Sequence, residues 1–162
     1  MISRRRLKEI FDYNPETGEF IRIFSRRRDY IGTVAGQRNQ KGKRQIRIDG
    51  KLYSANRLAV FWMTGRWPKK FVDHKDVDNS NDRWSNLRHA TPKQNGANQK
   101  LRSNNTTGFK GVSRTTGCDR FSAGIRVDGH RKHLGCFRTP ELAHEAYKRA
   151  AKKFFGKFAR FE

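Results

Sequence analysis

The apolar residues of this 162-residue chain never form a long run, which limits what the chain can fold into. The longest apolar stretch is residues 58–63, whereas a membrane-spanning helix needs about 20 apolar residues. Most other apolar residues stand in short alternating stretches bounded by Gly, Pro, Asp or Asn, a pattern typical of β-strands joined by tight turns. We therefore expect no membrane segment, and one domain or two very small ones.

Local patterns assign the secondary structure and a fold class. They predict helices over residues 4–11, 55–64, 91–100 and 140–155, and strands over residues 19–24, 45–48, 52–53, 71–74, 87–90, 111–114, 121–127 and 132–137. Asp-Gly pairs at residues 49–50 and 128–129 indicate tight hairpins, and Thr-Pro pairs at 91–92 and 139–140 indicate helix starts. The predicted class is α+β: β-hairpins, a small β-β-α core, and then a three-stranded antiparallel sheet packed on one helix.

The charge of the chain predicts a polyanionic partner. There are 37 Lys and Arg against 15 Asp and Glu, a net charge of +22. Residues 1–72 hold 18 basic and 6 acidic side chains, residues 101–162 hold 14 and 5, and the centre holds only 5 and 4. A basic excess of this size most often indicates nucleic acid.

Cysteine content and the N-terminal residues bear on the compartment. Two cysteines exclude a disulfide framework and a four-cysteine zinc site. Residues 1–13 contain three arginines but no apolar stretch, so we expect no secretory signal. The default expectation is a cytoplasmic protein with reduced thiols.

All acidic side chains of the central region are aspartates, interleaved with asparagines. They are Asp73, Asp76, Asp78 and Asp82. Such a cluster of hard oxygen ligands in a cationic protein suggests a divalent cation beside phosphate groups. A polar loop is the alternative at this point, because Asp and Asn also favour turns.

Three segments around these aspartates, in this order, resemble HNH endonucleases of the phage and intron-encoded homing type. The segments are Val72-Asp73-His74-Lys75-Asp76, Asn86-Leu87-Arg88 and Thr91-Pro92-Lys93-Gln94-Asn95. The resemblance extends upstream to Arg57-Leu58-Ala59 and to Gly65-Arg66-Trp67-Pro68. Many HNH nucleases carry a histidine at the position of Asn95, whereas the homing branch often has asparagine there.

The resemblance implies a division of roles within this core. Asp73 and Asn95 would bind one Mg²⁺ or Mn²⁺ ion, His74 would be the general base, and Asn86 would brace the loop and orient His74. Phosphodiester hydrolysis needs an activated water and stabilisation of charge on phosphate and leaving group. Imidazole suits the first task, and two protein oxygens leave most of a Mg²⁺ coordination sphere to water and phosphate.

The C-terminal residues resemble a different family, the plant ethylene-response-factor (Apetala-type) DNA-binding domain. The matching segments are Gly108-Phe109-Lys110-Gly111-Val112, Phe121-Ser122-Ala123-Gly124-Ile125-Arg126, Leu134-Gly135-Cys136-Phe137-Arg138-Thr139 and the small and aromatic residues at 143–156. The resemblance implies an exposed sheet face in the DNA major groove. The implied contact residues are Lys110, Arg114, Arg126, Arg131 and His133.

The sequence thus predicts a metal-dependent DNA endonuclease with an appended recognition module. We expect a nuclease domain over 1–100, a linker over 101–107 and a DNA-binding domain over 108–162. Double-stranded DNA is the expected partner, with no membrane and no obligatory protein partner, in the cytoplasm of a host cell if the chain is phage-encoded. A non-catalytic DNA-binding regulator and a basic RNA-binding protein are the alternatives.

Overall fold

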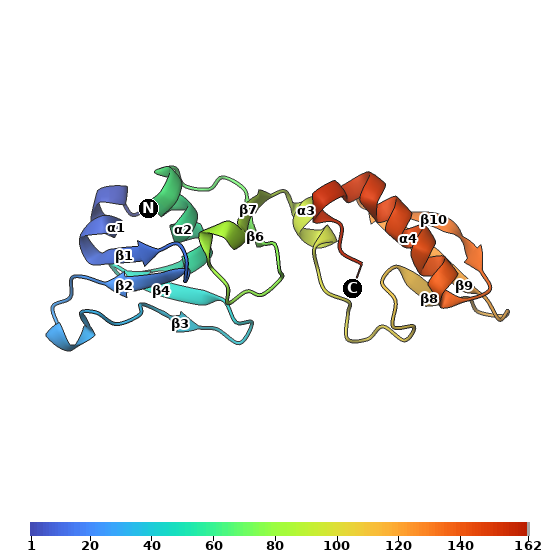
Figure 1. The fold of residues 1–162 in the computed structure, drawn as a ribbon, viewed down its shortest axis with the longest axis horizontal. Coiled ribbons are helices and arrows are strands. Elements are labelled where there is room, and N and C mark those ends of the chain that lie inside the picture. Colours follow the sequence, from blue (N-terminus) through green and yellow to red (C-terminus); the bar gives the residue numbers. More distant parts are fainter. Residues whose placement is uncertain (162) are drawn as a thin grey trace. The chain divides into compact units, whose positions relative to one another are not determined.

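The structure is a computed structural model, and it describes residues 1–161 (Figure 1). The chain divides into two compact units, between Ala90 and Thr91. We describe each unit by itself, because the positions of the parts relative to one another are not determined. Small antiparallel sheets and four α-helices among the described residues confirm the predicted α+β class.

The first unit contains two α-helices and three small sheets. Its helices are α1 (Arg4–Ile10) and α2 (Ala55–Thr64), and its strands are β1 (Phe11–Asn14), β2 (Glu19–Arg22), β3 (Gln37–Arg38), β4 (Arg44–Ile48), β5 (Lys51–Ser54), β6 (Phe71–His74) and β7 (Leu87–Ala90). Short 3₁₀ turns, η1 (Arg28–Tyr30) and η2 (Trp84–Asn86), complete it. The sheets are the β1-β2 hairpin, the β3-β4-β5 meander and the β6-β7 hairpin.

The meander shows how local sequence sets this topology. Asp49 and Gly50 have φ of 46° and 77°, so both adopt the left-handed conformation of a type I′ turn. That turn pairs Ile48 with Lys51 and fixes the register of β4 on β5. The predicted hairpin is therefore confirmed.

The core of the first unit collects around α2. The largest fully buried side chains are Leu7, Phe11, Phe20, Ile46 and Leu58, contributed by both helices and both N-terminal sheets. Each stabilises the fold by about 1.5–3 kcal/mol relative to an exposed side chain. Helix α2 ends at Gly65, whose φ of 69° closes the last turn.

The second unit is one sheet with two helices. It contains α3 (Pro92–Ala97), β8 (Val112–Arg114), β9 (Phe121–Val127), β10 (His130–Phe137), α4 (Pro140–Phe155) and the 3₁₀ turn η3 (Gly156–Phe158). The antiparallel sheet has the order β10-β9-β8. Helix α4 buries Ala143, Ala146 and Tyr147 against the inner face of the sheet, which carries Ala123 and Ile125.

The structure departs from the predicted elements in a few places. Helix α3 ends at Ala97 rather than at residue 100, because Gly96 and Asn98 are poor helix residues and Asn98 serves as the C-cap. The strand predicted over 132–137 begins at His130, directly after the turn at Asp128 and Gly129. Residues 101–107, the expected linker, connect α3 to β8 inside the second unit, and the limits of the two domains remain a prediction.

Candidate active site

The β6-β7 hairpin carries the residues singled out in the centre of the chain. Phe71, Val72, Asp73 and His74 of β6 pair in register with Ala90, His89, Arg88 and Leu87 of β7. Helix α2 supports this hairpin, because the buried side chain of Asn56 donates a hydrogen bond to the Val72 carbonyl at 3.2 Å. Asp73 and His74 therefore stand at the end of a braced strand, where the loop 75–83 begins.

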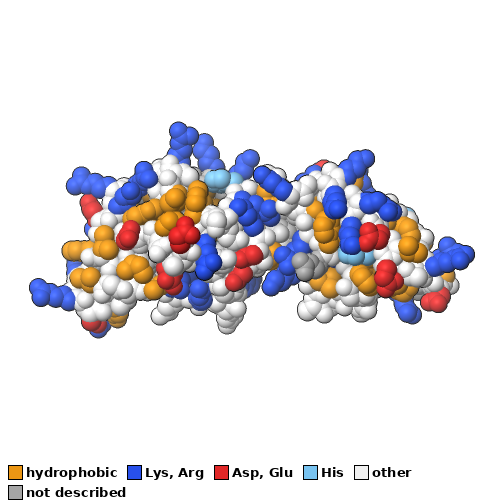
Figure 2. Space-filling view, viewed as in Figure 1, with side chains coloured by type: hydrophobic (Ala, Val, Ile, Leu, Met, Phe, Trp, Pro, Cys, Tyr) orange, Lys and Arg blue, Asp and Glu red, His pale blue; other side chains and the backbone are white. Residues whose placement is uncertain are grey.

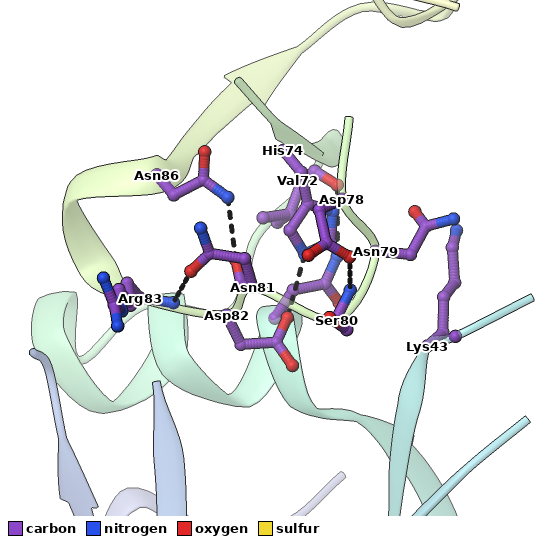
Figure 3. A network of polar contacts seen from close by, with 12 residues as sticks. Lys43, Val72, His74, Asp78, Asn79, Ser80, Asn81, Asp82, Arg83 and Asn86 are labelled. Atoms are coloured by element: carbon purple, nitrogen blue, oxygen red, sulfur yellow. Dashed lines mark hydrogen bonds and ion pairs between the residues drawn. The ribbon is translucent and has the colours of Figure 1, made fainter. Parts of the chain in front are cut away.

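His74 pairs with a carboxylate on that loop. Its Nε2 lies 2.9 Å from Oδ1 of Asp82, and the two side chains are only 5% and 4% exposed (Figure 3). A carboxylate can only accept a hydrogen bond, so this contact orients the ring. A buried imidazole–carboxylate pair is an arrangement that serves general base catalysis.

Asp73 faces an arginine across the hairpin. Nε of Arg88 lies 2.8 Å from Oδ2 of Asp73, and the side chains are 14% and 7% exposed. The register explains the pair, because Asp73 and Arg88 are directly opposite each other in the β6-β7 ladder. The guanidinium of Arg88 thus compensates the charge of the Asp73 carboxylate in a largely buried position.

Asn86 ties the two ends of the loop together. Its Nδ2 donates to Oδ1 of Asp76 at 2.9 Å and to the carbonyl of Asn81 at 2.8 Å. Its Oδ1 accepts from the Asp76 N–H at 3.1 Å. Burial acts to raise the pKa of Asp76, but hydrogen bonds from Asn81, Asn86 and the Asp78 N–H outweigh it and hold that pKa below its usual value.

The aspartate cluster thus divides into two kinds of residue. Asp76 and Asp78 form local turns, because Oδ1 of Asp76 accepts from the Asp78 N–H and Oδ1 of Asp78 accepts from the Ser80 N–H. Asp73 and Asp82 are buried in pairs with Arg88 and His74. The polar-loop alternative therefore describes Asp76 and Asp78, whereas Asp73 and Asp82 belong to the candidate site.

The first hairpin of the chain holds Asp82 in place. The Tyr13 hydroxyl on β1 donates to the Asp82 carbonyl at 2.8 Å in a buried contact, and burial followed by the charge of Asp82 raises the pKa of Tyr13. The turn after β1 packs directly on the loop, since a Cβ on Gly18 would stand 2.3 Å from the Asp82 carbonyl carbon. The Trp84 N–H donates to the Pro15 carbonyl at 3.0 Å.

Asn95 lies on the other unit of the chain. It is part of α3, which begins with a capping box in which Thr91 accepts from the Gln94 N–H and Gln94 accepts from the Thr91 N–H. The structure brings Asp73, His74 and Asn86 together on one hairpin and its loop, and it does not set the distance from these residues to Asn95.

The two predicted metal ligands are, by residue type, suited to a hard divalent ion. Asp73 offers carboxylate oxygen and Asn95 offers amide oxygen, the ligand types that Mg²⁺ prefers. A hydrogen bond from Arg88 to Oδ2 of Asp73 is compatible with ligation, because ligating carboxylates usually have such partners. Among residues 1–161, no three His, Cys, Asp or Glu side chains gather as a metal site.

Three predicted DNA contacts lie on the outer face of the second-unit sheet. Arg126 pairs with Arg131 and Gly124 with His133 across β9 and β10, so their side chains share the face opposite the buried Ala123 and Ile125. The Arg131 guanidinium lies close over Gly124, where a Cβ would be 3.0 Å from its Nε. Arg126 and Arg131 also line a depression of about 250 Å³ on this surface.

The other two predicted contacts have different surroundings. Arg114 pairs with Phe121 and its guanidinium lies 5.6 Å from the centre of that ring, on the side of the sheet that faces α4. Nζ of Lys110 donates to the carbonyls of Ala97 and Gln99 at 3.0 and 2.6 Å. Burial, with a smaller effect of Arg160, lowers the pKa of Lys110 to about 8.

Sequence reasoning did not find Asp82, Tyr13 or Gly18 as parts of the site. Asp82 is one of four similar aspartates in the sequence, and no spacing rule separates it from Asp78. Tyr13 lies 69 positions before Asp82, and only the packing of the first hairpin on the loop brings them together.

A short hairpin whose first strand ends in Asp-His, followed along the chain by a capped helix, has the order of elements that a nuclease core of the β-β-α type requires. A family model described as HNH endonuclease matches residues 53–97. The chain is 32% identical to Protein 3.8 of Escherichia phage T7 over 91 residues. The matched region covers 56% of this chain and 74% of that protein. It is 32% identical over 111 residues to the Uncharacterized HNH endonuclease L560 of Acanthamoeba polyphaga mimivirus, covering 68% of this chain and 57% of that protein.

The chain therefore contains an HNH endonuclease domain, at residues 53–97. This domain indicates nuclease activity on DNA. No solved structure matches the chain. The family match ends before residue 108, so the likeness of the C-terminal residues to an ethylene-response-factor domain stays a prediction. None of the helices among residues 1–161 is long and apolar enough to cross a membrane.

Proposed function

We propose that the protein is a divalent-metal-dependent DNA endonuclease that hydrolyses a phosphodiester bond to 5′-phosphate and 3′-hydroxyl ends. The observation that carries the proposal is the buried His74–Asp82 pair next to Asp73, inside the segment that matches the HNH family. The relatives, from a phage and a mimivirus, support a phage-encoded enzyme. Such an enzyme would act in the host cytoplasm.

His74 would act as the general base. It accepts a proton from a water molecule, the water oxygen attacks phosphorus, and the bond from phosphorus to the 3′ oxygen breaks. The 3′ oxygen leaves, takes a proton from solvent and becomes a hydroxyl, while the phosphate stays on the 5′ end. Asp82 holds the ring through Nε2, so that the orientation of His74 does not depend on bound DNA.

Asp73 and Asn95 would hold the metal ion, one per active site. When bound, Mg²⁺ or Mn²⁺ neutralises charge on the phosphate and stabilises the leaving oxygen. Arg88 would hold the Asp73 carboxylate in place on β6 through their ion pair. Asn86 would keep the loop closed around His74 through its bonds to Asp76 and Asn81.

The second unit would hold the duplex. The outer sheet face carries Arg126, Arg131 and His133 beside the small residues Ser122 and Gly124, so a DNA groove could approach closely. Arginine can read guanine through two hydrogen bonds. On the face shown in Figure 2, Lys and Arg side chains are spread over both units and outnumber Asp and Glu, which supports phosphate contacts. Because Lys110 already donates to two carbonyls, we place it at the edge of this surface as a lesser contact.

Cleavage of supercoiled plasmid DNA tests the proposal. Wild-type protein should nick the plasmid with Mg²⁺ and not with EDTA, and His74→Ala should lose at least about 100-fold in rate while DNA affinity changes little. His130→Ala, which removes an exposed histidine from β10, is the matched control and should cleave normally. DNA binding without Mg²⁺-dependent cleavage would instead favour the non-catalytic regulator.

A further inference from the structure

The loop between β6 and β7 holds a buried carboxylate against the proposed base, at a position that sequence comparison alone does not assign. We propose that Asp82 is a positioning residue that fixes the tautomer of His74, with the proton on Nε2 and the basic lone pair on Nδ1. The inference rests on the proposed role of His74 in the nuclease reaction.

The proposed position of the proton follows from the partner of Nε2. Oδ1 of Asp82 lies 2.9 Å from Nε2 of His74, and the carboxylate oxygen can only accept. The neutral ring must therefore donate from Nε2, which leaves Nδ1 as the nitrogen that can take a proton from water. Because both side chains are almost fully buried, water competes little for this hydrogen bond.

The position of Asp82 is set by contacts that need neither metal nor DNA. On one side, the Tyr13 hydroxyl donates to the Asp82 carbonyl and the turn at Gly18 packs on the Asp82 backbone. On the other side, Asn86 donates to the carbonyl of Asn81, the preceding residue. Figure 3 shows Asp82 between Asn81 and Arg83 with its side chain directed toward His74. The base is thus preorganised by the fold of the first unit.

The other loop carboxylates do not perform this task. Asp76 accepts from Asn81, Asn86 and the Asp78 N–H, and Asp78 is exposed and accepts from the Ser80 N–H. Replacement of Asp78, whose charge also acts on His74, therefore changes the charge of the same loop by the same amount without removing the Asp82–His74 hydrogen bond, and Asp78→Ala is the matched control.

The first experiment measures the tautomer directly, in protein without metal and DNA. Two-bond ¹H–¹⁵N NMR spectra distinguish a protonated from an unprotonated ring nitrogen, and the His74 signals are identified by their loss in His74→Gln. We expect Nε2-protonated His74 in the wild type and in Asp78→Ala, and a mixture of tautomers in Asp82→Asn and Asp82→Ala. An Nδ1-protonated ring in the wild type, or an unchanged tautomer in both Asp82 variants, overturns the inference.

The second experiment measures plasmid cleavage with Mg²⁺. Asp82→Asn keeps the shape of the side chain, so it should fold even where Asp82→Ala does not, but its amide can turn an NH₂ group toward the ring. We expect kcat to fall by about 10-fold to 100-fold, the range found when the hydrogen-bond partner of a metal-binding histidine is removed, with KM for DNA within about twofold. In a His74→Ala background the same substitution should have no further effect, because Asp82 acts through His74.

The two proposals fail in different ways. A wild-type protein that does not cleave DNA removes the proposed function, and the tautomer result still stands as a property of the fold. A wild-type protein that cleaves DNA while Asp82→Asn retains full kcat removes the role of Asp82 and leaves the nuclease assignment intact.

Discussion

The substitution Gly18→Ala tests how closely the first turn packs on the loop of the candidate site. Comparison with Gly50→Ala separates this packing from backbone strain. Gly18 has φ of 77°, and a Cβ there would lie 2.3 Å from the Asp82 carbonyl carbon and 2.4 Å from the Arg83 nitrogen. The left-handed backbone costs alanine about 1–2 kcal/mol. Overpacking against backbone atoms, which cannot rotate away, adds about 1–3 kcal/mol. We expect Gly18→Ala to lower the free energy of unfolding by about 2–5 kcal/mol.

Gly50→Ala is the matched control for this experiment. Gly50 has the same φ of 77° in the β4-β5 turn, but a Cβ on Gly50 would have no other atom within 4 Å, so only the backbone strain of about 1–2 kcal/mol remains. With m of about 2 kcal/mol/M, the urea midpoint should fall by about 0.5–1 M for Gly50→Ala and by about 1–2.5 M for Gly18→Ala.

Tryptophan fluorescence is the assay, because Trp62, Trp67 and Trp84 all lie in the first unit. Gly18→Ala should also reduce plasmid cleavage at temperatures where it stays folded, since the displaced backbone carries Asp82. Equal midpoint shifts in the two variants would refute the packing of the first turn on the loop.

Three further predictions concern the ion pair, the DNA surface and Lys110. Arg88→Met should lower the free energy of unfolding by about 2–4 kcal/mol, less than for a fully buried pair because Arg88 is partly exposed. The double variant Asp73→Asn/Arg88→Met should recover most of that loss in fluorescence-monitored unfolding, and no recovery would show that the pair is uncoupled. If about eight cationic contacts form, log affinity for duplex DNA should fall against log salt with a slope near −7, and Arg126→Ala/Arg131→Ala should reduce that slope by about 2. Lys148→Ala, which removes the α4 partner of Glu145, should leave the slope unchanged in the same anisotropy titrations. Lys110 should titrate near pH 8 in ¹³C NMR of labelled lysines, and its pKa below the usual 10.5 means that the unfolded chain holds this proton more tightly. The stability of the second unit should therefore rise with pH between about 8 and 10.5 in wild type relative to Lys110→Met, and a Lys110 that titrates with the other lysines would contradict its burial.

Much of the fold could be predicted because its signals are local. The Asp-Gly pairs at 49–50 and 128–129 impose two positive φ values and thereby set two hairpins. Thr139 and Pro140 start α4, and Gly156 ends it, as the sequence predicts. The helical spacing of apolar residues would also place Leu142 on the inner face of α4, but Leu142 is exposed, because the buried face is centred on Ala143 and Ala146.

The candidate site could be predicted only in part. The motif identified the segment that the family match covers, and with it Asp73 and His74. The motif could not distinguish Asp82 from the other aspartates. It also could not show that the Lys110 ammonium donates hydrogen bonds to backbone carbonyls of the same chain. Both contacts depend on how distant or irregular segments of the backbone pack together, which no local sequence pattern encodes.

By itself, the sequence determined the two Asp-Gly turns, the starts of α3 and α4, the end of α4 and the basic charge, since all of these depend on residues a few positions apart or on composition. Only the tertiary structure decided which carboxylate meets His74. That pairing depends on the path of the 75–83 loop. Tyr13 and Gly18 of the first hairpin fix this path by contacting Asp82, which lies more than 60 residues further along the sequence. Long-range packing selects one side chain among several chemically equal candidates, and it does so only once the whole unit has folded.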